Sequence, residues 1–206
     1  MASPATIEVT ALGAASKVSN DKSRPLAAIA RKGISSKKIS HLLYRLARYF
    51  NCRHVVELGT SLGLNAMYLA TVPQSRVTTF EGCPQTAALA RQHFAEMQYN
   101  NIHLVEGNID NTLPDYLANA GLPVDMAFVD ANHRHTPTLA YFETLLAHSH
   151  EHTVLVFDDI HWSAGMSRAW QAICRHPRVQ LSIDLYRLGL VFLNPAIGGG
   201  HYRLMF

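Results

Sequence analysis

Three carboxylates close two apolar segments of the sequence, and their residue types suit a metal ion. Asp130 ends one segment, while Asp158 ends another and is followed directly by Asp159. If these segments are neighbouring strands, the carboxylates meet at one edge and repel one another unless they are protonated, paired or metal-bound. Oxygen ligands in this number suit Mg²⁺ or Ca²⁺. A structural role is equally open, in which Asp158 or Asp159 caps the next helix and Asp130 pairs with Arg134.

Two histidines beside these carboxylates are candidates for proton transfer. His133 lies three residues after Asp130, and His161 lies two residues after Asp159. An imidazole titrates near neutral pH, so either histidine could remove a proton from an acceptor. Trp162 could form a wall for an aromatic acceptor. Because the chain has 12 histidines, the alternative for His133 is a surface loop position. The alternative for Trp162 is core packing.

A loop with two glycines follows the apolar segment 54–58. Glycine lets the backbone turn tightly and approach a ligand, and the helix that follows begins with unpaired N–H groups. The candidate ligand-binding residues of this loop are Glu57, Gly59, Thr60, Ser61 and Gly63. The spacing is GxxxG rather than the GxGxxG of dinucleotide sites, so a plain strand-to-helix turn is the alternative.

Two further loops contain residues that could bind a nucleoside. Glu81 stands about 20 residues past the glycine loop, where an acid can accept hydrogen bonds from a ribose diol. Asp110 could accept from the amine of an adenine, with Ile109 against the face of the ring. The alternatives are a solvated carboxylate at Glu81 and a helix cap at Asp110.

The elements that must position these residues alternate between strands and helices. The expected strands are 54–58, 76–80, 101–105, 124–130, 152–158, 179–186 and 188–194. The expected helices are 37–50, 63–72, 84–98, 113–120, 136–149 and 163–176. Five strand–helix units and a closing hairpin predict a doubly wound α/β fold, with a mostly parallel sheet covered on both faces. Ligands of such sheets bind at the carboxyl ends of the strands, where all the candidate residues stand.

Composition indicates one globular domain without a disulfide framework or membrane span. The chain has 206 residues, 48% of them hydrophobic and 16% charged, and its three cysteines form no CxxC pair. No apolar run reaches the ~18 residues of a membrane span, and no secretory signal follows Met1, so we expect a cytoplasmic protein. Residues 1–53 carry a balance of +8 and residues 54–206 a balance of −5. The basic front suggests an anionic partner.

Five motifs in this order resemble a known family. VVELGTSLG, FEGCP, VEGNID, FVDANHR and VLVFDDIHW are similar to the class I S-adenosylmethionine-dependent methyltransferases, and among them to the small O-methyltransferases of the catechol and caffeoyl-coenzyme-A type. The resemblance covers roughly residues 36–194. It implies a Rossmann-like, seven-stranded sheet with an antiparallel last strand. We therefore expect a basic N-terminal extension over 1–35 and a single methyltransferase domain over 36–206.

The resemblance also implies roles for the cofactor-binding residues. The loop Glu57–Gly63 would cradle the methionine part of S-adenosylmethionine, Glu81 would bind its ribose, and Ile109 and Asp110 would flank its adenine. Asp130 is expected to contact the cofactor as well.

For the reaction itself, the resemblance implies a metal site and a base. In metal-dependent members an Asp at the place of Asp130 and an Asp-Asn pair at the place of Asp158 and Asp159 hold a divalent cation. Their catalytic lysine stands where this chain has His133. We expect methyl transfer to a hydroxyl of a small acceptor, with Asp130, His133 and His161 as the catalytic candidates and Mg²⁺ or another divalent cation at Asp130, Asp158 and Asp159.

Other functions remain open on the sequence alone. An RNA methyltransferase on the same fold could track phosphates with its basic residues. Those residues are Lys17, Lys22, Arg24, Arg31, Lys32, Lys37 and Lys38. A non-enzymatic protein could bind the cofactor as a sensor or dock on a partner through the basic helix 37–50. A nicotinamide dehydrogenase is disfavoured because GxGxxG is absent. The family often dimerises, so a homodimer is a further expectation.

Overall fold

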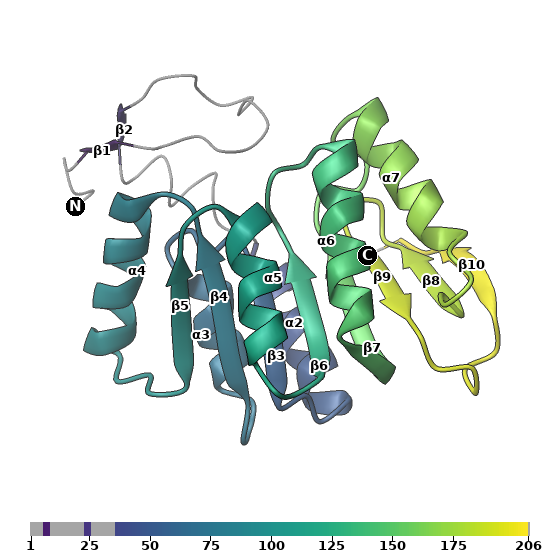
Figure 1. The fold of residues 1–206 in the computed structure, drawn as a ribbon, viewed down its shortest axis with the longest axis horizontal. Helices are drawn as coiled ribbons and strands as arrows, with labels where there is room; N and C mark the ends of the chain where they lie inside the picture. The colour runs from purple at the N-terminus through teal and green to yellow at the C-terminus, as the bar shows by residue number, and fades with distance from the viewer. Residues whose placement is uncertain (1–5, 9–22, 26–35, 206) are drawn as a thin grey trace.

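The computed structural model describes residues 6–8, 23–25 and 36–205. Two three-residue strands, β1 (Thr6–Glu8) and β2 (Ser23–Pro25), pair antiparallel, and β1 contacts helix α4 (Pro84–Glu96). Figure 1 shows this pair on the side toward which the parallel strands of the main sheet point. The remainder of the basic extension expected over 1–35 lies outside the described residues.

The described chain folds around one mixed sheet. Its strands are β3 (His54–Leu58), β4 (Arg76–Glu81), β5 (Ile102–Glu106), β6 (Val124–Val129), β7 (Ser149–Phe157), β8 (Leu181–Asp184), β9 (Gly189–Phe192) and β10 (Gly200–Arg203). They lie in the order β5-β4-β3-β6-β7-β9-β8-β10, in which only β9 runs against its neighbours. This confirms the doubly wound, mostly parallel sheet and the antiparallel strand of the closing hairpin.

The strand count differs from the sequence prediction. The sheet has eight strands rather than seven, because β10 adds to the edge beside β8. β10 begins at the last of three consecutive glycines, and all of its residues are at least partly exposed. Such a segment lacks the apolar run or alternation that marks a buried strand.

Helices cover both faces of the sheet. They are α2 (Lys37–Tyr49), α3 (Leu64–Ala70), α4, α5 (Ile109–Asn119), α6 (His135–Ala147) and α7 (Ala164–Cys174). Side chains of α2, α3 and α4 pack into one apolar cluster, and those of α5, α6 and α7 pack into another on the opposite face. Figure 1 shows α5 and α6 in front of the sheet and α2 and α3 behind it. Strands covered on both sides explain the nearly continuous apolar runs in the sequence.

One helix begins earlier than the sequence predicts, and the difference moves two candidate residues. The start of α5 is Ile109 rather than residue 113, because Asn108 caps the helix by accepting a hydrogen bond from the Asp110 amide at 3.1 Å. An Asn side chain can satisfy an end N–H in this way. Ile109 and Asp110 therefore stand on the first helical turn rather than in a loop.

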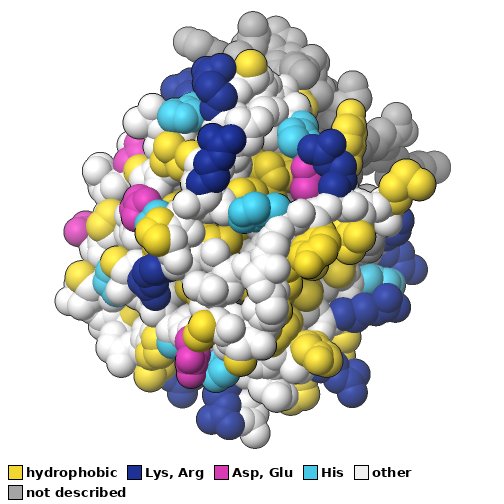
Figure 2. Space-filling view, turned by 90° about the vertical axis from the view of Figure 1, so that its right-hand side faces the viewer, with side chains coloured by type: hydrophobic (Ala, Val, Ile, Leu, Met, Phe, Trp, Pro, Cys, Tyr) yellow, Lys and Arg dark blue, Asp and Glu magenta, His cyan; other side chains and the backbone are white. Residues whose placement is uncertain are grey.

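The far edge of the sheet exposes apolar side chains among basic ones. Tyr186, Tyr202 and Leu204 keep more than half of their surface in solvent. Figure 2 looks onto this end of the molecule and shows Lys and Arg scattered over it, with few acidic side chains. Within the described ranges, no helix combines the length and apolar character needed to cross a membrane.

Candidate active site

The candidate residues come together along the edge formed by the carboxyl ends of the parallel strands, which we call the upper rim. The strand order places them as Asp110 after β5, Glu81 on β4, Glu57 on β3, Asp130 after β6 and Asp158 after β7. β3 and β6 are adjacent although they are not consecutive, so the topological switch point lies between them. Doubly wound sheets bind their ligands at this point.

Both glycines of the β3–α3 loop are required by close packing within the protein. Gly59 has φ +101°, and a Cβ there would lie 2.2 Å from the carbonyl oxygen of Asp130. Gly63 has φ +84°, and a Cβ there would lie 2.4 Å from the ring of Phe94 on α4. The first glycine thus lets the β3 loop touch the β6 loop at the switch point.

Glu57 is a buried carboxylate with spare hydrogen-bonding capacity. Its side chain is fully enclosed, and the Thr79 hydroxyl donates to Oε2 at 2.5 Å, while Oε1 has no hydrogen-bond partner. Burial raises the pKa of Glu57 to about 8. Thr60 joins the same hydrogen-bonded group, because its hydroxyl lies 2.6 Å from the Thr79 hydroxyl. A buried acceptor of this kind is suited to a cationic or N–H-bearing ligand group.

Glu81 ties two loops of the upper rim together. The Ser61 amide donates to Oε2 and the Cys83 amide donates to Oε1, both at 2.9 Å. Burial raises the pKa of Glu81, although these backbone N–H groups oppose the shift. Both carboxylate oxygens are fixed in place, and each has a second lone pair with which it could accept from a diol.

Asp110 belongs to a chain of hydrogen bonds that crosses the upper rim. The Tyr141 hydroxyl donates to Asp110 Oδ1 at 2.6 Å, and Asn132 Nδ2 donates to the Tyr141 oxygen at 3.2 Å. Ile109 is half-buried, and with Asp110 and Tyr141 it lines a cavity of about 210 Å³ between α5 and α6. Sequence reasoning missed Asn132 and Tyr141, because their roles depend on contacts between separate elements.

The loop after β6 contains the base candidate in an unusual conformation. Asn132 and His133 are consecutive non-glycine residues with positive φ, +66° and +44°. His133 Nε2 lies 3.5 Å from Asp130 Oδ1, while His133 Nδ1 and Asn132 Oδ1 are buried without a partner. Burial and nearby Asp158 raise the pKa of Asp130; Asp130 in turn raises the pKa of His133, although burial opposes that shift. Strained residues and unsatisfied groups persist where a site needs them.

The acidic cluster does not fit the metal site that the sequence predicts. Asp158 has a fully buried side chain that is bound at both oxygens by Arg187, with Nε 2.9 Å from Oδ1 and Nη2 2.7 Å from Oδ2. Asp159 lies 3.4 Å from the same guanidinium. Across the described ranges, no group of three or more His, Cys, Asp or Glu is arranged to hold a metal ion. Of the predicted ligands, Asp130 therefore lies beside His133, whereas Asp158 and Asp159 lie beside Arg187.

The helix-cap role that the sequence left open for Asp158 or Asp159 is not found. The cap of α7 is Ser163, which accepts from the Met166 amide at 3.2 Å, rather than Asp158 or Asp159. Asp130 has His133 beside it. Arg187 had no signal in the sequence, since it lies in a turn 29 residues from its partner.

His161, the second base candidate, is held by other side chains at both ring nitrogens. Its Nε2 lies 3.0 Å from Asp184 Oδ2 and its Nδ1 lies 3.2 Å from the Ser167 hydroxyl, so both ring nitrogens have partners. Although burial opposes it, the bond from His161 lowers the pKa of Asp184. Trp162 is half-buried, and its ring centroid lies 6.2 Å from that of His133. The tryptophan thus stands beside the base candidate, as an acceptor wall would.

Comparison with known proteins assigns the family. The strand order and the switch point define a doubly wound α/β protein with its candidate ligand-binding residues on the upper rim. Residues 56–160, half of the chain, match the family described as "Methyltransferase domain", and the chain belongs to this family. No curated protein matches it in sequence.

Solved structures share the fold at low sequence identity. The O-methyltransferase from Bacillus cereus in complex with SAH is 24% identical over 81% of this chain and 86% of that one, with a TM-score of 0.69. TomG from Streptomyces achromogenes, an O-methyltransferase in complex with SAM, is 24% identical over 78% and 82%, with a TM-score of 0.67. A putative caffeoyl-CoA O-methyltransferase from Staphylococcus aureus is 18% identical over 82% and 88%, with a TM-score of 0.72.

Proposed function

We propose that this protein transfers the methyl group of S-adenosylmethionine to a hydroxyl of a small acceptor. The observation that carries the proposal is the set of buried side-chain atoms without a hydrogen-bond partner. The described residues contain three of them, Glu57 Oε1, Asn132 Oδ1 and His133 Nδ1, and all three belong to the strands or loops that meet at the switch point. Native structures leave few such atoms unsatisfied, so this group is best explained by a ligand that completes it.

The residues present fit the cofactor. Oε1 of Glu57 is an acceptor for the amino group of the methionine part, and burial keeps that interaction strong. Glu81 accepts the ribose hydroxyls with its two fixed oxygens, while Asp110 and Ile109 receive the adenine on the first turn of α5. When bound, the cofactor supplies a methyl group whose C–S bond breaks as the acceptor oxygen forms the new C–O bond.

His133 is the proposed general base for the acceptor hydroxyl. Its ring takes up the proton, and Asp130 at 3.5 Å stabilises the imidazolium that results. The raised pKa of His133, caused mainly by Asp130 against the effect of burial, makes it a stronger proton acceptor. Trp162 beside this ring provides an apolar surface for an aromatic acceptor.

The proposal that the acceptor group is a hydroxyl is supported by similarly folded proteins as well as by the residues of the site. Similarly folded proteins include O-methyltransferases, two of them in complex with SAH or SAM. An RNA acceptor would depend on the basic segment over 1–35, most of which lies outside the described residues. A small-molecule acceptor requires only the base and the aromatic wall on the upper rim. We favour the small acceptor for this reason, and the homodimer stays a prediction.

Turnover assays test this function. The full chain is incubated with S-adenosylmethionine and either a panel of catechols and hydroxybenzoates or total RNA, and methylated products are measured by mass spectrometry. We expect O-methylated small molecules. Asp110→Asn should raise the KM for S-adenosylmethionine, whereas Asp115→Asn, an exposed position on the same helix, should leave it unchanged. Methylated RNA with no small-molecule product would contradict the proposal.

A further inference from the structure

Arg187 stands in the turn between β8 and β9 and reaches back to the upper rim. Its backbone carbonyl accepts a hydrogen bond from the Ile160 amide at 3.1 Å, which fixes this turn against the loop after β7. Its guanidinium then meets Asp158 through two parallel N–H···O bonds of 2.9 and 2.7 Å. Such a fork is the strongest and most directional way for a protein to pair a carboxylate.

This guanidinium pairs with two of the three carboxylates that would have to share a cation. It is bound to both oxygens of Asp158 and lies 3.4 Å from Asp159 Oδ1. The bond to Asp158, with the charges of Asp159 and Asp130, raises the pKa of Arg187, so the side chain stays cationic. A divalent cation bound by Asp158 would have to displace the arginine from a carboxylate that has no exposed surface. The chain thus supplies its own positive charge to the cluster.

One edge of the guanidinium is engaged and the rest of the side chain reaches solvent. Nε and Nη2 make the bonds to Asp158, and 46% of the Arg187 side chain remains exposed. An arginine presents five N–H donors in one plane, so the edge opposite Asp158 can donate to a further oxygen. Asp158 holds this donor at a fixed orientation, which reduces the entropy lost when an acceptor binds.

We propose that Arg187 takes the place of the divalent cation, so that this enzyme needs no metal ion and holds the acceptor oxygen with a guanidinium. The proposal rests on the proposed methyltransferase function. It assigns Arg187 as an acceptor-binding residue and Asp158 as the residue that positions it. Acceptors whose hydroxyl oxygen becomes anionic when His133 removes its proton are favoured, because a guanidinium pairs with an anionic oxygen and cannot chelate a diol as a metal does.

Manganese binding tests the proposal without any turnover. Chelator-treated full-length protein is titrated with Mn²⁺ and the free ion is followed by electron paramagnetic resonance. We expect no stoichiometric binding by the wild type or by Arg187→Lys, which retains the charge. Arg187→Met should gain one Mn²⁺ per chain, because Asp130, Asp158 and Asp159 lose their cation, and Arg187→Met with Asp130→Asn should lose it again. Stoichiometric binding by the wild type that disappears in Asp158→Asn would overturn the proposal.

Kinetics provides a second measurement that does not depend on how well the methionine variant folds. Wild-type turnover should be unchanged by EDTA and by added Mg²⁺, and loss of turnover in EDTA with recovery in Mg²⁺ would overturn the proposal. Arg187→Lys should raise the acceptor KM by about 10- to 100-fold, the effect of losing a charge-assisted hydrogen bond. An unchanged acceptor KM would equally contradict it.

S-Adenosylhomocysteine binding separates this proposal from the methyltransferase function. Arg187→Lys should bind S-adenosylhomocysteine as the wild type does, since the residues proposed to hold the cofactor belong to other loops. A wild type that fails to bind it would refute the methyltransferase function, while the manganese titration would still decide whether Arg187 excludes a metal.

Discussion

Two aspartates at opposite ends of β6 differ in their roles: Asp125 is hydrogen-bonded within the fold, and Asp130 belongs to the candidate active site. Asp125 lies at the amino end, where the Arg53 and His54 amides donate to Oδ2 at 2.7 Å and His150 Nε2 lies 2.8 Å from Oδ1. Asp130 follows the carboxyl end and has His133 at 3.5 Å. Although burial acts the other way, the hydrogen bonds lower the pKa of Asp125, whereas burial and Asp158 raise the pKa of Asp130.

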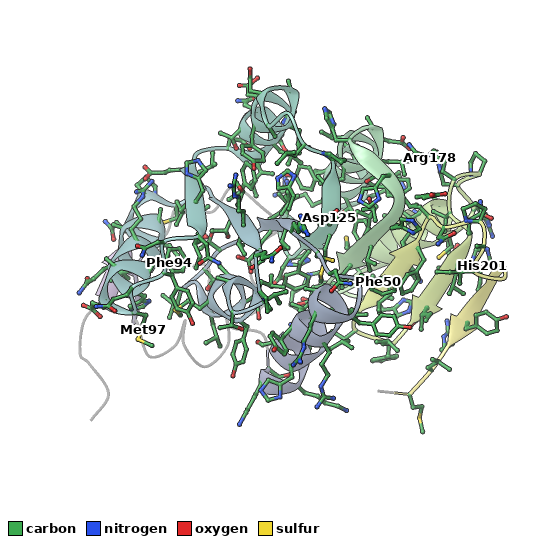
Figure 3. All side chains as sticks on the ribbon, turned by 90° about the horizontal axis from the view of Figure 1, so that it is seen from below. Phe50, Phe94, Met97, Asp125, Arg178 and His201 are labelled. Atoms are coloured by element: carbon green, nitrogen blue, oxygen red, sulfur yellow. The ribbon has the colours of Figure 1, made fainter. Side chains whose placement is uncertain are left out.

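The polar groups around the two aspartates also differ in how fully their hydrogen bonds are satisfied. At the amino end, which Figure 3 views from below with Asp125 labelled, His54 has both ring nitrogens within 3.0 Å of an oxygen, one from Pro123 and one from Tyr116. At the carboxyl end, Asn132 and His133 each keep a buried atom without a partner. The amino end is satisfied by the protein itself, whereas the carboxyl end keeps the buried atoms that the proposed ligand would satisfy.

Replacing His133 should give the largest difference in kcat between variants at the carboxyl and amino ends of β6. His133→Asn removes the proposed base, so we expect kcat to fall by about 10²- to 10⁴-fold. Its free energy of unfolding should stay the same or rise, because the variant relieves a buried, unpaired ring nitrogen and Asn tolerates positive φ better than most residues. Steady-state kinetics and urea unfolding measure both effects. His150→Asn at the amino end is the matched control, and an equal loss of kcat there would remove the distinction.

The pH dependence of stability should follow Glu57. Its pKa of about 8 in the folded protein exceeds the ordinary value of 4.5, so the folded state binds the extra proton between these values. Stability therefore falls as the pH rises through this range. Urea unfolding from pH 4.5 to 8 should show Glu57→Gln gaining stability relative to the wild type with increasing pH. A difference that stays constant with pH would show that Glu57 is ionised in the folded protein.

Replacing Asp125 should affect folding rather than turnover. Asp125→Asn weakens charge-assisted hydrogen bonds, and we expect a loss of about 1.5–3 kcal/mol in the free energy of unfolding. The kcat per folded molecule should match the wild type, because Asp125 is at the opposite end of β6 from the upper rim. Denaturant midpoints and active-site-normalised rates check this pair of expectations. A large fall in kcat with intact stability would mean that the amino end also takes part in function.

The smallest expected effect concerns Tyr141. Tyr141→Phe removes the donor that orients Asp110, so S-adenosylhomocysteine should bind about 3- to 10-fold more weakly. Discrimination between S-adenosylhomocysteine and its inosine analogue should also decline, because Asp110 is proposed to accept a hydrogen bond from the adenine amine. Calorimetry with both ligands checks this. If affinity fell equally for the two ligands, Tyr141 would have only a packing role.

The sequence could predict where the site lies but only part of how it works. Glu57, Glu81 and Asp130 could be located because apolar strands mark their own ends, and a doubly wound sheet brings those ends together. The pairing of Arg187 with Asp158 could not be predicted, because it depends on how the β8–β9 turn folds back over the sheet. The occupied nitrogens of His161 are a similar case, because Asp184 comes from β8. The edge strand β10 escaped prediction because glycines precede it and little of it is buried.

Calorimetric binding of S-adenosylhomocysteine tests most directly whether the carboxyl end of the sheet is the cofactor site. The wild type and Asp125→Asn should each bind one ligand per chain with the same Kd, while Glu81→Gln should bind about 10-fold more weakly or worse because the ribose loses a charged acceptor. No binding by the wild type, or equal affinity in Glu81→Gln, would contradict the assignment.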